Sequence, residues 1–198
     1  LGAVAVLAEI SGHYLPDQIQ QLAQSVRIPV IAMSDLGPRV SLIAGRFFQP
    51  PSHHFPVIGI TGTNGKSSAS LFIAQAMGSS RKVAELGTLG NGVPGQLQPS
   101  THTTLDPVTL QATLASLKAQ QAEMVAMEVS SHALHQGRVA AIDFDMAVLT
   151  NFSRDHLDYH GTMADYAEAK SLLFKMASLK TTLINVDDPL GQRLVGEL

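Results

Sequence analysis

The sequence has 198 residues but no cysteine and no tryptophan, and only 5% of its residues are aromatic. Without cysteine the chain can form no disulfide, no thiolate nucleophile and no cysteine-ligated zinc site, which fits a reducing cytoplasm. The sequence has no apolar run long enough to span a bilayer. It also has no signal-peptide pattern, in which a basic N-terminal region precedes a cleavable apolar segment. We therefore expect a cytoplasmic protein that does not insert into a membrane.

Charged residues are scarce as well, at 15% of the chain, and the formal net charge is −3. Such a chain has no basic field for a nucleic-acid backbone, so we expect no nucleic-acid partner. Any phosphate binding must come from a local site, and the ligand is expected to be small. Apolar residues make up 45% of the chain, which is enough for a sizeable core.

The first fifty residues indicate the remnant of an α/β domain. The pattern predicts a strand at 1–10, a weak helix at 16–25, a strand at 28–33 and a helix at 35–47 that Asp35 caps. Residues 49–56 hold three prolines and two histidines, which suits a linker with no regular element and predicts a domain boundary. Because the chain starts at Leu1 rather than Met, and ends in a helical pattern without a cap, we expect an excised fragment.

Strands and helices alternate after residue 56, which is typical of an α/β fold with a mostly parallel sheet and flanking helices. The predicted strands are 57–61, 82–86, 124–129, 144–150 and 181–186, and the predicted helices are 66–77, 106–120 and 163–177. Between 87 and 101 an insertion replaces a helix, and Asn91-Gly92 is predicted to form a hairpin turn within it.

A glycine-rich loop between a strand and a helix is the strongest functional signal. Its residues are Thr61-Gly62-Thr63-Asn64-Gly65-Lys66-Ser67-Ser68. Glycines allow backbone N–H groups to face phosphate oxygens, Lys66 can reach the β- and γ-phosphates, and Ser67 can hold magnesium. The first glycine of the general P-loop pattern is displaced, since Ile60 stands at that position. A chance Gly-Lys-Ser at a strand–helix turn is the alternative, and the strand before and helix after disfavour it.

Two groups of residues downstream could bind a metal. Glu128 ends a predicted strand, at the edge where ligands collect in an open parallel sheet, although a solvated glutamate is the plainer alternative. The segment 155–160 packs two carboxylates and two imidazoles into six residues. His156 and His160 are four residues apart and would share a helix face, so a zinc site is a rival interpretation that would leave the phosphate loop without a purpose.

Lys170 stands on the apolar stripe of the predicted helix 163–177. Its stem could pack while the ammonium reaches water, a common arrangement for an isolated lysine. If the ammonium is buried, the pKa falls and a neutral amine becomes available to react with carbon dioxide.

Together these segments resemble the Mur ligases. The loop Thr61–Ser67 is shared with the related folylpolyglutamate synthetases, whereas Met127–Leu134, Thr150–Gly161 and the following Lys170 resemble the UDP-N-acetylmuramoyl-tripeptide synthetase branch. The resemblance covers essentially the whole chain. It implies that residues 1–50 end a UDP-substrate-binding domain and that residues 56–198 form a truncated, P-loop ATPase-like central ATP-binding domain.

The resemblance also implies roles for individual residues, with ATP and magnesium as cofactors. It assigns catalysis to Lys66, Glu128, His156 and Lys170. It assigns nucleotide binding to Gly62, Thr63, Asn64, Gly65, Lys66, Ser67, Ser68 and Asn151. It assigns magnesium to Ser67, Glu128, His156 and Lys170, the last as a carbamate. It assigns the substrate to His102, Thr103, Thr104, Ser130, Gln136 and Arg138.

The match is weaker in the substrate segment. His102 stands where relatives often have asparagine, and the residues after Thr104 depart from the usual pattern. Asp106 and Pro107 have a sufficient structural role as the N-cap and first residue of the next helix.

The reaction implied is ATP-dependent addition of a third amino acid, meso-diaminopimelate or L-lysine, to UDP-N-acetylmuramoyl-L-alanyl-D-glutamate through an acyl phosphate. This muramoyl-dipeptide and the amino acid are the expected partners, and the fragment alone is expected to have little or no activity. Three alternatives stay open: another Mur-type or folylpolyglutamate ligase, a P-loop switch or motor, and a non-catalytic nucleotide-binding subunit.

Overall fold

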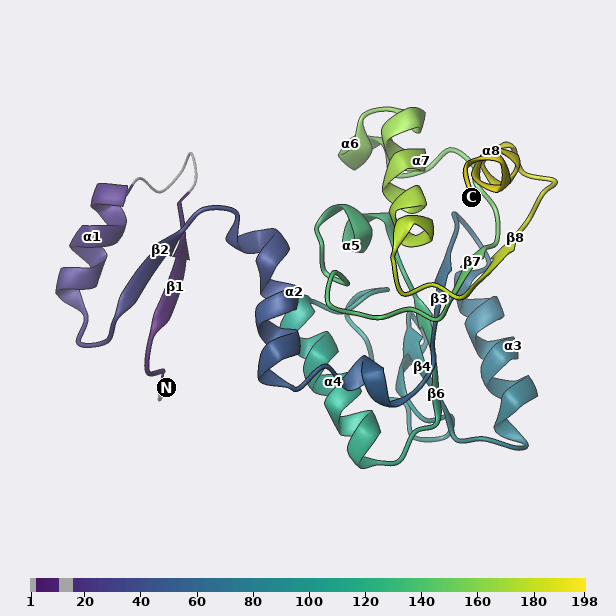
Figure 1. Cartoon of the computed structure of the whole chain (residues 1–198), viewed down its shortest axis with the longest axis horizontal. Helices are drawn as coiled ribbons and strands as arrows, with labels where there is room; N and C mark the ends of the chain where they lie inside the picture. The colour runs from purple at the N-terminus through teal and green to yellow at the C-terminus, as the bar shows by residue number, and fades with distance from the viewer. Residues whose placement is uncertain (1–2, 11–15) are drawn as a thin grey trace.

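The computed structural model describes residues 3–10 and 16–198 and contains two separate sheets (Figure 1). The smaller sheet pairs β1 (Val6–Glu9) with β2 (Val30–Met33) in parallel, joined by helix α1 (Pro16–Ser25). The predicted order of strand, helix and strand is confirmed, but β1 is shorter than the predicted strand 1–10: residues 3–5 are not strand, and residues 1–2 lie outside the described residues. The resulting β-α-β unit is an α/β element, as the alternating pattern indicated.

Helix α2 (Leu36–Phe47) connects the small sheet to the larger body and lies between them in Figure 1. Ser41 Oγ accepts a hydrogen bond of 3.0 Å from Ala141 N, and a Cβ added to Gly45 would lie 2.9 Å from Ala141 Cβ. The predicted cap at Asp35 is wrong. Asp35 precedes the helix with a left-handed φ of 52° and makes no side-chain cap bond, because capping requires an extended backbone at that position.

The proline-rich linker also differs from the prediction of no regular element. Pro51–His54 forms a 3-10 helix, η1, in which His53 N donates to Pro50 O at 3.2 Å. Pro51 fits the first turn because its missing N–H would have no partner there. The linker is therefore a short ordered element next to the larger sheet.

The larger sheet has six strands in the order β5-β4-β6-β3-β7-β8, and only β5 runs antiparallel to its neighbour. The mostly parallel sheet predicted from the alternation is thus confirmed. The strands are β3 (Val57–Thr61), β4 (Val83–Gly87), β5 (Gly90–Gly92), β6 (Met124–Glu128), β7 (Met146–Leu149) and β8 (Thr181–Ile184).

Helices cover both faces of this sheet (Figure 1). On one face α3 (Lys66–Gly78) packs Ala74 against Ile58, Ile60 and Val83. On the other face α4 (Pro107–Ala119) and the C-terminal elements enclose a larger apolar cluster. The remaining helices are α5 (Ser131–His135), α6 (Leu157–His160), α7 (Met163–Ser171), the 3-10 helix η2 (Leu172–Lys175) and α8 (Pro189–Glu197).

The structure departs from two local predictions in this domain and agrees with a third. Asn91-Gly92 is not a turn but part of strand β5, since Gly87 pairs with Gly90 and the turn falls at residues 88–89. The predicted helix 163–177 ends as α-helix at Ser171 and continues as η2. Asp106 does cap α4, because its side chain accepts bonds from the backbone N–H groups of residues 108 and 109.

The topology brings the carboxyl ends of β3, β4, β6 and β7 to one edge of the sheet, where the segments that follow each strand meet. In the described part of the chain, no helix is both long and apolar enough to cross a membrane.

Candidate active site

The glycine-rich loop connects the buried strand β3 to the first turn of α3, as predicted. Gly62 has φ 147° and Gly65 has φ 81°, values that side chains rarely adopt. A Cβ added to Gly62 would also collide with Thr150 Oγ1. The loop therefore needs glycine at position 62 both for its backbone conformation and for the close approach of residue 150.

The segment that follows β7 holds the loop from the side. Asn64 N donates to Asn151 Oδ1 at 3.0 Å, and Asn64 O accepts from Asn151 Nδ2 at 2.9 Å and from Thr150 Oγ1 at 2.7 Å. Thr63 N donates to Asn151 O at 2.9 Å. Asn151, predicted to contact nucleotide, thus lies beside the loop and braces it through both ends of its amide.

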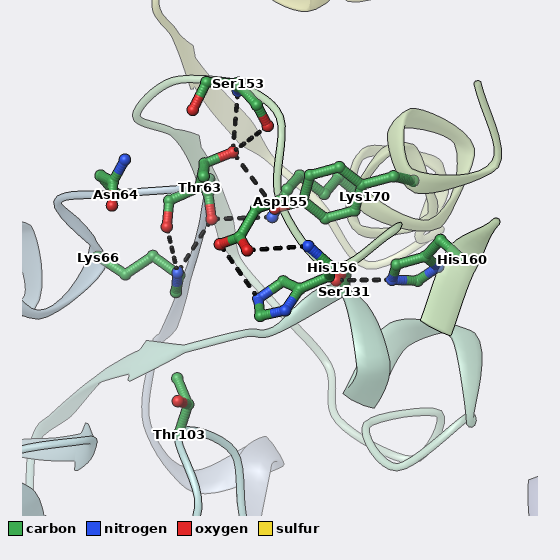
Figure 2. Close-up of polar contacts among 12 residues, drawn as sticks. Thr63, Asn64, Lys66, Thr103, Ser131, Ser153, Asp155, His156, His160 and Lys170 are labelled. Carbon is green, nitrogen blue, oxygen red and sulfur yellow. Dashed lines mark hydrogen bonds and ion pairs between the residues drawn. The ribbon is translucent and has the colours of Figure 1, made fainter. Parts of the chain in front are cut away.

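Lys66 folds back onto its own loop. Its Nζ donates to Gly62 O and to Thr63 O, both at 3.0 Å (Figure 2). Burial lowers the pKa of Lys66, while the charges of Glu128 and Asp155 act in the opposite direction. The ammonium is therefore only partly hydrated and lies within the field of two carboxylates.

Lys170 is buried, with 1% of its surface exposed, so its ammonium does not reach water. Its Nζ donates to Gly62 O at 2.8 Å and lies 4.5 Å from the centroid of the Tyr166 ring. Burial, and to a smaller extent the neighbouring charge of Lys66, lower the pKa of Lys170 to about 7. The ammonium groups of Lys66 and Lys170 thus share one acceptor, the Gly62 carbonyl.

Glu128 is the last residue of β6 and is 1% exposed, which rules out the solvated alternative. Its Oε1 accepts from Thr88 N at 2.8 Å, and Thr88 Oγ1 lies 3.4 Å from Oε2. A Cβ added to Gly87 would collide with the carboxylate. The side chain is held in one position by Thr88 and by the absence of a side chain at residue 87.

His156 is exposed and precedes α6 with φ 50°, and its Nε2 lies 3.5 Å from Asp155 Oδ2. Asp155 in turn raises the pKa of both Lys66 and Lys170 through its charge. In Figure 2 Asp155 lies between Lys66 and His156. The predicted histidine is thereby connected to the two lysines at the loop through a carboxylate that had no predicted role.

His160 differs from His156 in burial, although both rings pack against His132 and Tyr166. It is buried, its Nε2 lies 2.9 Å from Ser131 Oγ, and burial lowers its pKa. Within the described ranges, no group of three or more histidine, aspartate or glutamate side chains could hold a metal ion. The rival zinc interpretation therefore has no support in the geometry.

The predicted substrate residues form a connected network next to Glu128. Thr104 Oγ1 donates to Glu128 O at 2.9 Å and accepts from Ser130 N at 3.0 Å. Arg138 donates through Nη1 to Thr104 O at 3.1 Å and through Nε to Gln136 Oε1 at 2.8 Å. These contacts orient the guanidinium, and the side chain of Ser130 caps α5.

The remaining predicted residues lie around this network. Thr103 Oγ1 accepts from Thr88 Oγ1 at 3.2 Å and lies apart from the lysines in Figure 2. His102 is exposed, with Nδ1 2.9 Å from Thr101 Oγ1. Ser67 and Ser68 lie in the first turn of α3.

The donor set fits a nucleotide with magnesium. Hydroxyl and carboxylate oxygens, as on Ser67 and Glu128, are the ligands magnesium prefers, and a glycine loop with two lysines suits phosphate oxygens. The structure brings Lys66 and Lys170 to one carbonyl, and it places Glu128 where its charge acts on Lys66. His156 lies beside Asp155, whose charge acts on both lysines.

Three residues at this site were missed from the sequence: Thr88, Asp155 and Tyr166. Thr88 follows the carboxyl end of a strand, which is a signal that could have placed it at the site. Asp155 stood in the acidic and imidazole-rich segment but had no assigned partner. Nothing in the sequence pattern distinguishes Tyr166 from an ordinary core residue of its helix.

The pKa of Lys170 leads to a prediction about stability. Between about pH 7 and 10.5 the unfolded chain binds one proton more at this residue than the folded chain does, so stability should rise with pH across that window. Lys170→Met removes this dependence. The free energy of unfolding is measured with denaturant from pH 6 to 10. At pH 6 the variant should be more stable than wild type, and above pH 7 this difference should shrink by up to about 1.4 kcal/mol per pH unit. A constant difference across the range would contradict a buried, neutralised lysine.

Comparison with known proteins gives one family match and several near relatives. Residues 60–198 match the family model described as the Mur ligase middle domain. A Pseudomonas aeruginosa protein named UDP-N-acetylmuramoyl-L-alanyl-D-glutamate--2,6-diaminopimelate ligase is 50% identical over 196 residues, which is 98% of this chain and 38% of that protein. A protein of the same name from Alkalilimnicola ehrlichii is 48% identical over 199 residues, covering 100% of this chain and 40% of that protein. This chain thus spans about two fifths of the length of these relatives.

Solved structures agree. A structure titled as the same diaminopimelate ligase superposes with a TM-score of 0.80 at 34% identity, covering 97% of this chain and 42% of that chain. A Mycobacterium tuberculosis folylpolyglutamate synthase complexed with ADP superposes with a TM-score of 0.63 at 17% identity, covering 91% of this chain and 47% of that chain. The latter likeness concerns the fold alone.

Proposed function

Since this chain belongs to the Mur ligase family, we propose that it is the nucleotide- and magnesium-binding part of an ATP-dependent ligase acting on UDP-N-acetylmuramoyl-L-alanyl-D-glutamate. The observation that carries the proposal is that Lys66 and Lys170, 104 residues apart, donate to the same carbonyl of the phosphate loop. The names of the relatives favour 2,6-diaminopimelate over lysine as the added amino acid. ATP as the co-substrate assigns the reaction to the cytoplasm.

In the proposed reaction a carboxylate oxygen of the D-glutamate attacks the γ-phosphorus of ATP, and ADP leaves. The amine of the amino acid then attacks the carbonyl carbon of the acyl phosphate, phosphate leaves with its bridging oxygen, and the nitrogen loses a proton. The carboxylate is a poor electrophile until its oxygen becomes part of a phosphate leaving group. Activation by phosphoryl transfer is therefore the step that needs the loop.

The chain's own residues supply charge and position for that transfer. Lys66 would exchange its bonds to Gly62 O and Thr63 O for phosphate oxygens, because a phosphate offers a stronger, charged acceptor. Magnesium, held by Ser67, Glu128, His156 and the carbamate of Lys170, would offset the negative charge that develops. Burial of Lys170 supports this assignment, since a neutral amine is the form that reacts with carbon dioxide.

Substrate binding is proposed for the network beside Glu128. Arg138 is oriented by Gln136 and by the backbone of Thr104, and a held guanidinium suits a carboxylate or diphosphate. Residues 1–50 are proposed as the end of a UDP-substrate-binding domain, in keeping with their α/β elements.

Phosphate release tests the proposal against its rivals. A chimera in which residues 1–198 replace the matched segment of the Pseudomonas aeruginosa relative should release phosphate only when both muramoyl-dipeptide and amino acid are present. Release with ATP alone would indicate a switch or motor, and nucleotide binding without release would indicate a binding subunit. Turnover by residues 1–198 alone would contradict the expectation that this chain has little activity by itself.

The close approach of residue 87 to Glu128 gives a further prediction. Gly87→Ala should displace the Glu128 carboxylate and weaken ADP binding in the presence of Mg²⁺ by about tenfold or more, while ADP binding in EDTA should change little. Titration calorimetry of this chain measures both affinities. Gly78→Ala is the matched control, because an added Cβ there meets nothing within 4 Å. Equal losses with and without the metal would count against Glu128 as a metal ligand.

A further inference from the structure

Tyr166 is fully buried next to the glycine-rich loop, and the proposed mechanism assigns it no role. Its hydroxyl lies 3.2 Å from Thr63 Oγ1, and its ring packs against Phe152 at 5.0 Å and against His160 at 5.2 Å between centroids. The Lys170 ammonium lies over the ring at 4.5 Å. One side chain therefore touches the loop, the buried lysine and two neighbouring segments.

Tyr166 and Lys170 are one helical turn apart on α7, so they lie on the same face of the helix. They contact consecutive residues of the loop: Tyr166 reaches Thr63, and Lys170 reaches Gly62. Helix α7 thus holds the loop at two adjacent points, one through a neutral hydroxyl and one through a cation.

The hydrogen-bond capacity of Thr63 assigns the direction of its bond to Tyr166. A threonine hydroxyl has one hydrogen to donate and two lone pairs that accept. Thr63 Oγ1 accepts from Ser153 N at 2.9 Å and donates to Ser153 O at 3.1 Å. Tyr166 must then be the donor to the remaining lone pair. Burial raises the pKa of the Tyr166 phenol, so the hydroxyl keeps its proton.

The two anchors of α7 differ in how they respond to a nucleotide. Lys170 shares the Gly62 carbonyl with Lys66, and carbamylation would remove the positive charge of Lys170 that strengthens its bond there. The Tyr166 anchor carries no charge and binds a different residue. It can hold the loop whatever the state of the lysine.

We propose that Tyr166 is a positioning residue that keeps Gly62 and Thr63 in the shape that receives nucleotide phosphates, through the hydrogen bond from its hydroxyl to Thr63. The inference rests on the proposed function, because it names a further determinant of nucleotide binding at the same loop. Tyr166 does not touch the phosphates. It acts by fixing the direction of the backbone N–H groups that do.

The test is a mutant cycle on this chain with two readouts. The first is the Kd for ADP in Mg²⁺, measured by titration calorimetry for Tyr166→Phe, Thr63→Val, Thr63→Ser and the double variant Tyr166→Phe with Thr63→Val. The second is hydrogen exchange of the peptide covering residues 61–66 without nucleotide. Tyr159→Phe is the matched control, because the Tyr159 hydroxyl bonds His135 and Gln136 and not the loop.

We expect Tyr166→Phe to raise the Kd about tenfold and to speed exchange in the loop, since one buried hydrogen bond is lost while the ring contacts stay. Thr63→Ser should recover most of the ADP affinity that Thr63→Val loses, because serine keeps the hydroxyl. The double variant should bind no worse than Thr63→Val alone, since both changes remove the same bond. A merely structural role would not produce this non-additivity or the rescue by serine.

The proposal would be overturned if the fold-losses in ADP affinity of the two single variants multiplied in the double variant. It would also be overturned if Tyr166→Phe kept the wild-type affinity for ADP although its loop exchanged faster. If Tyr166→Phe fails to fold, the mutant cycle cannot be measured. The Kd values of Thr63→Val and Thr63→Ser for ADP are then compared, and equal values overturn the inference. Wild-type chain that binds no ADP overturns the proposed function and this inference together. Binding by wild type with unaltered loop exchange in both single variants overturns this inference only.

Discussion

We expect replacement of Lys66 with methionine to lower the rate of phosphate release by the chimera about 10³-fold, because the lysine that would meet the transferred phosphoryl group is lost. Methionine keeps most of the length and the apolar character of the lysine stem but carries no charge. The variant also loses the hydrogen bonds that Lys66 donates to Gly62 O and Thr63 O within the loop. The release of phosphate with saturating substrates measures the effect, and the Kd for ADP should rise in parallel.

Lys175→Met is the matched control for this variant. Lys175 lies in η2, is about half exposed and pairs with Glu168, outside the loop. Its replacement should leave the rate within about twofold, since exposed ion pairs contribute little. If the Lys66 variant kept a tenth or more of the wild-type rate, the loop could not be the site of phosphoryl transfer.

The second large effect is expected for Glu128→Gln, with a loss of about 10²- to 10³-fold in the same assay. Glutamine has the same shape and its oxygen can still accept from Thr88 N, so the local packing is kept. The variant loses the negative charge that a divalent cation requires and that raises the pKa of Lys66. Raising the Mg²⁺ concentration should restore part of the rate, because the defect lies in metal affinity.

Glu123→Gln provides the control at the opposite end of the same strand. Glu123 precedes β6 and accepts from Lys82 N, far along the strand from the loop. Its replacement should change neither the rate nor the dependence on Mg²⁺. A Glu128→Gln enzyme whose lost activity does not respond to Mg²⁺ would show that the carboxylate has another task than binding the cation.

Much of the larger sheet could be predicted because its signals are local. Alternating apolar runs and amphipathic segments located β3, β4, β6 and β8, and the cap at Asp106 located the start of α4. One prediction failed where strand pairing overrode a local turn signal. Asn91-Gly92 is a good turn in isolation, yet pairing of Gly87 with Gly90 places the turn three residues earlier, at 88–89.

The site was predicted in part. The glycine loop was found because strand, glycines, lysine and helix follow one another in the chain, and the burial of Lys170 was one of two alternatives its helix position allowed. Thr88 and Asp155 were missed because their partners, Glu128 and the two lysines, are distant in sequence. The spacing of residues along the sequence does not show which residues that are distant in sequence contact one another in the fold.

The sequence by itself determined the α/β class, the loop between β3 and α3 and the residue types that phosphate and magnesium chemistry need. These follow from periodicity and from the backbone freedom of glycine, which depend on near neighbours only. The tertiary structure alone decided which side chains meet: Lys170 and Lys66 at one carbonyl, and Tyr166 beneath Thr63. The strand order β4-β6-β3-β7 brings these segments to one edge, and that order is set by the packing of the whole sheet.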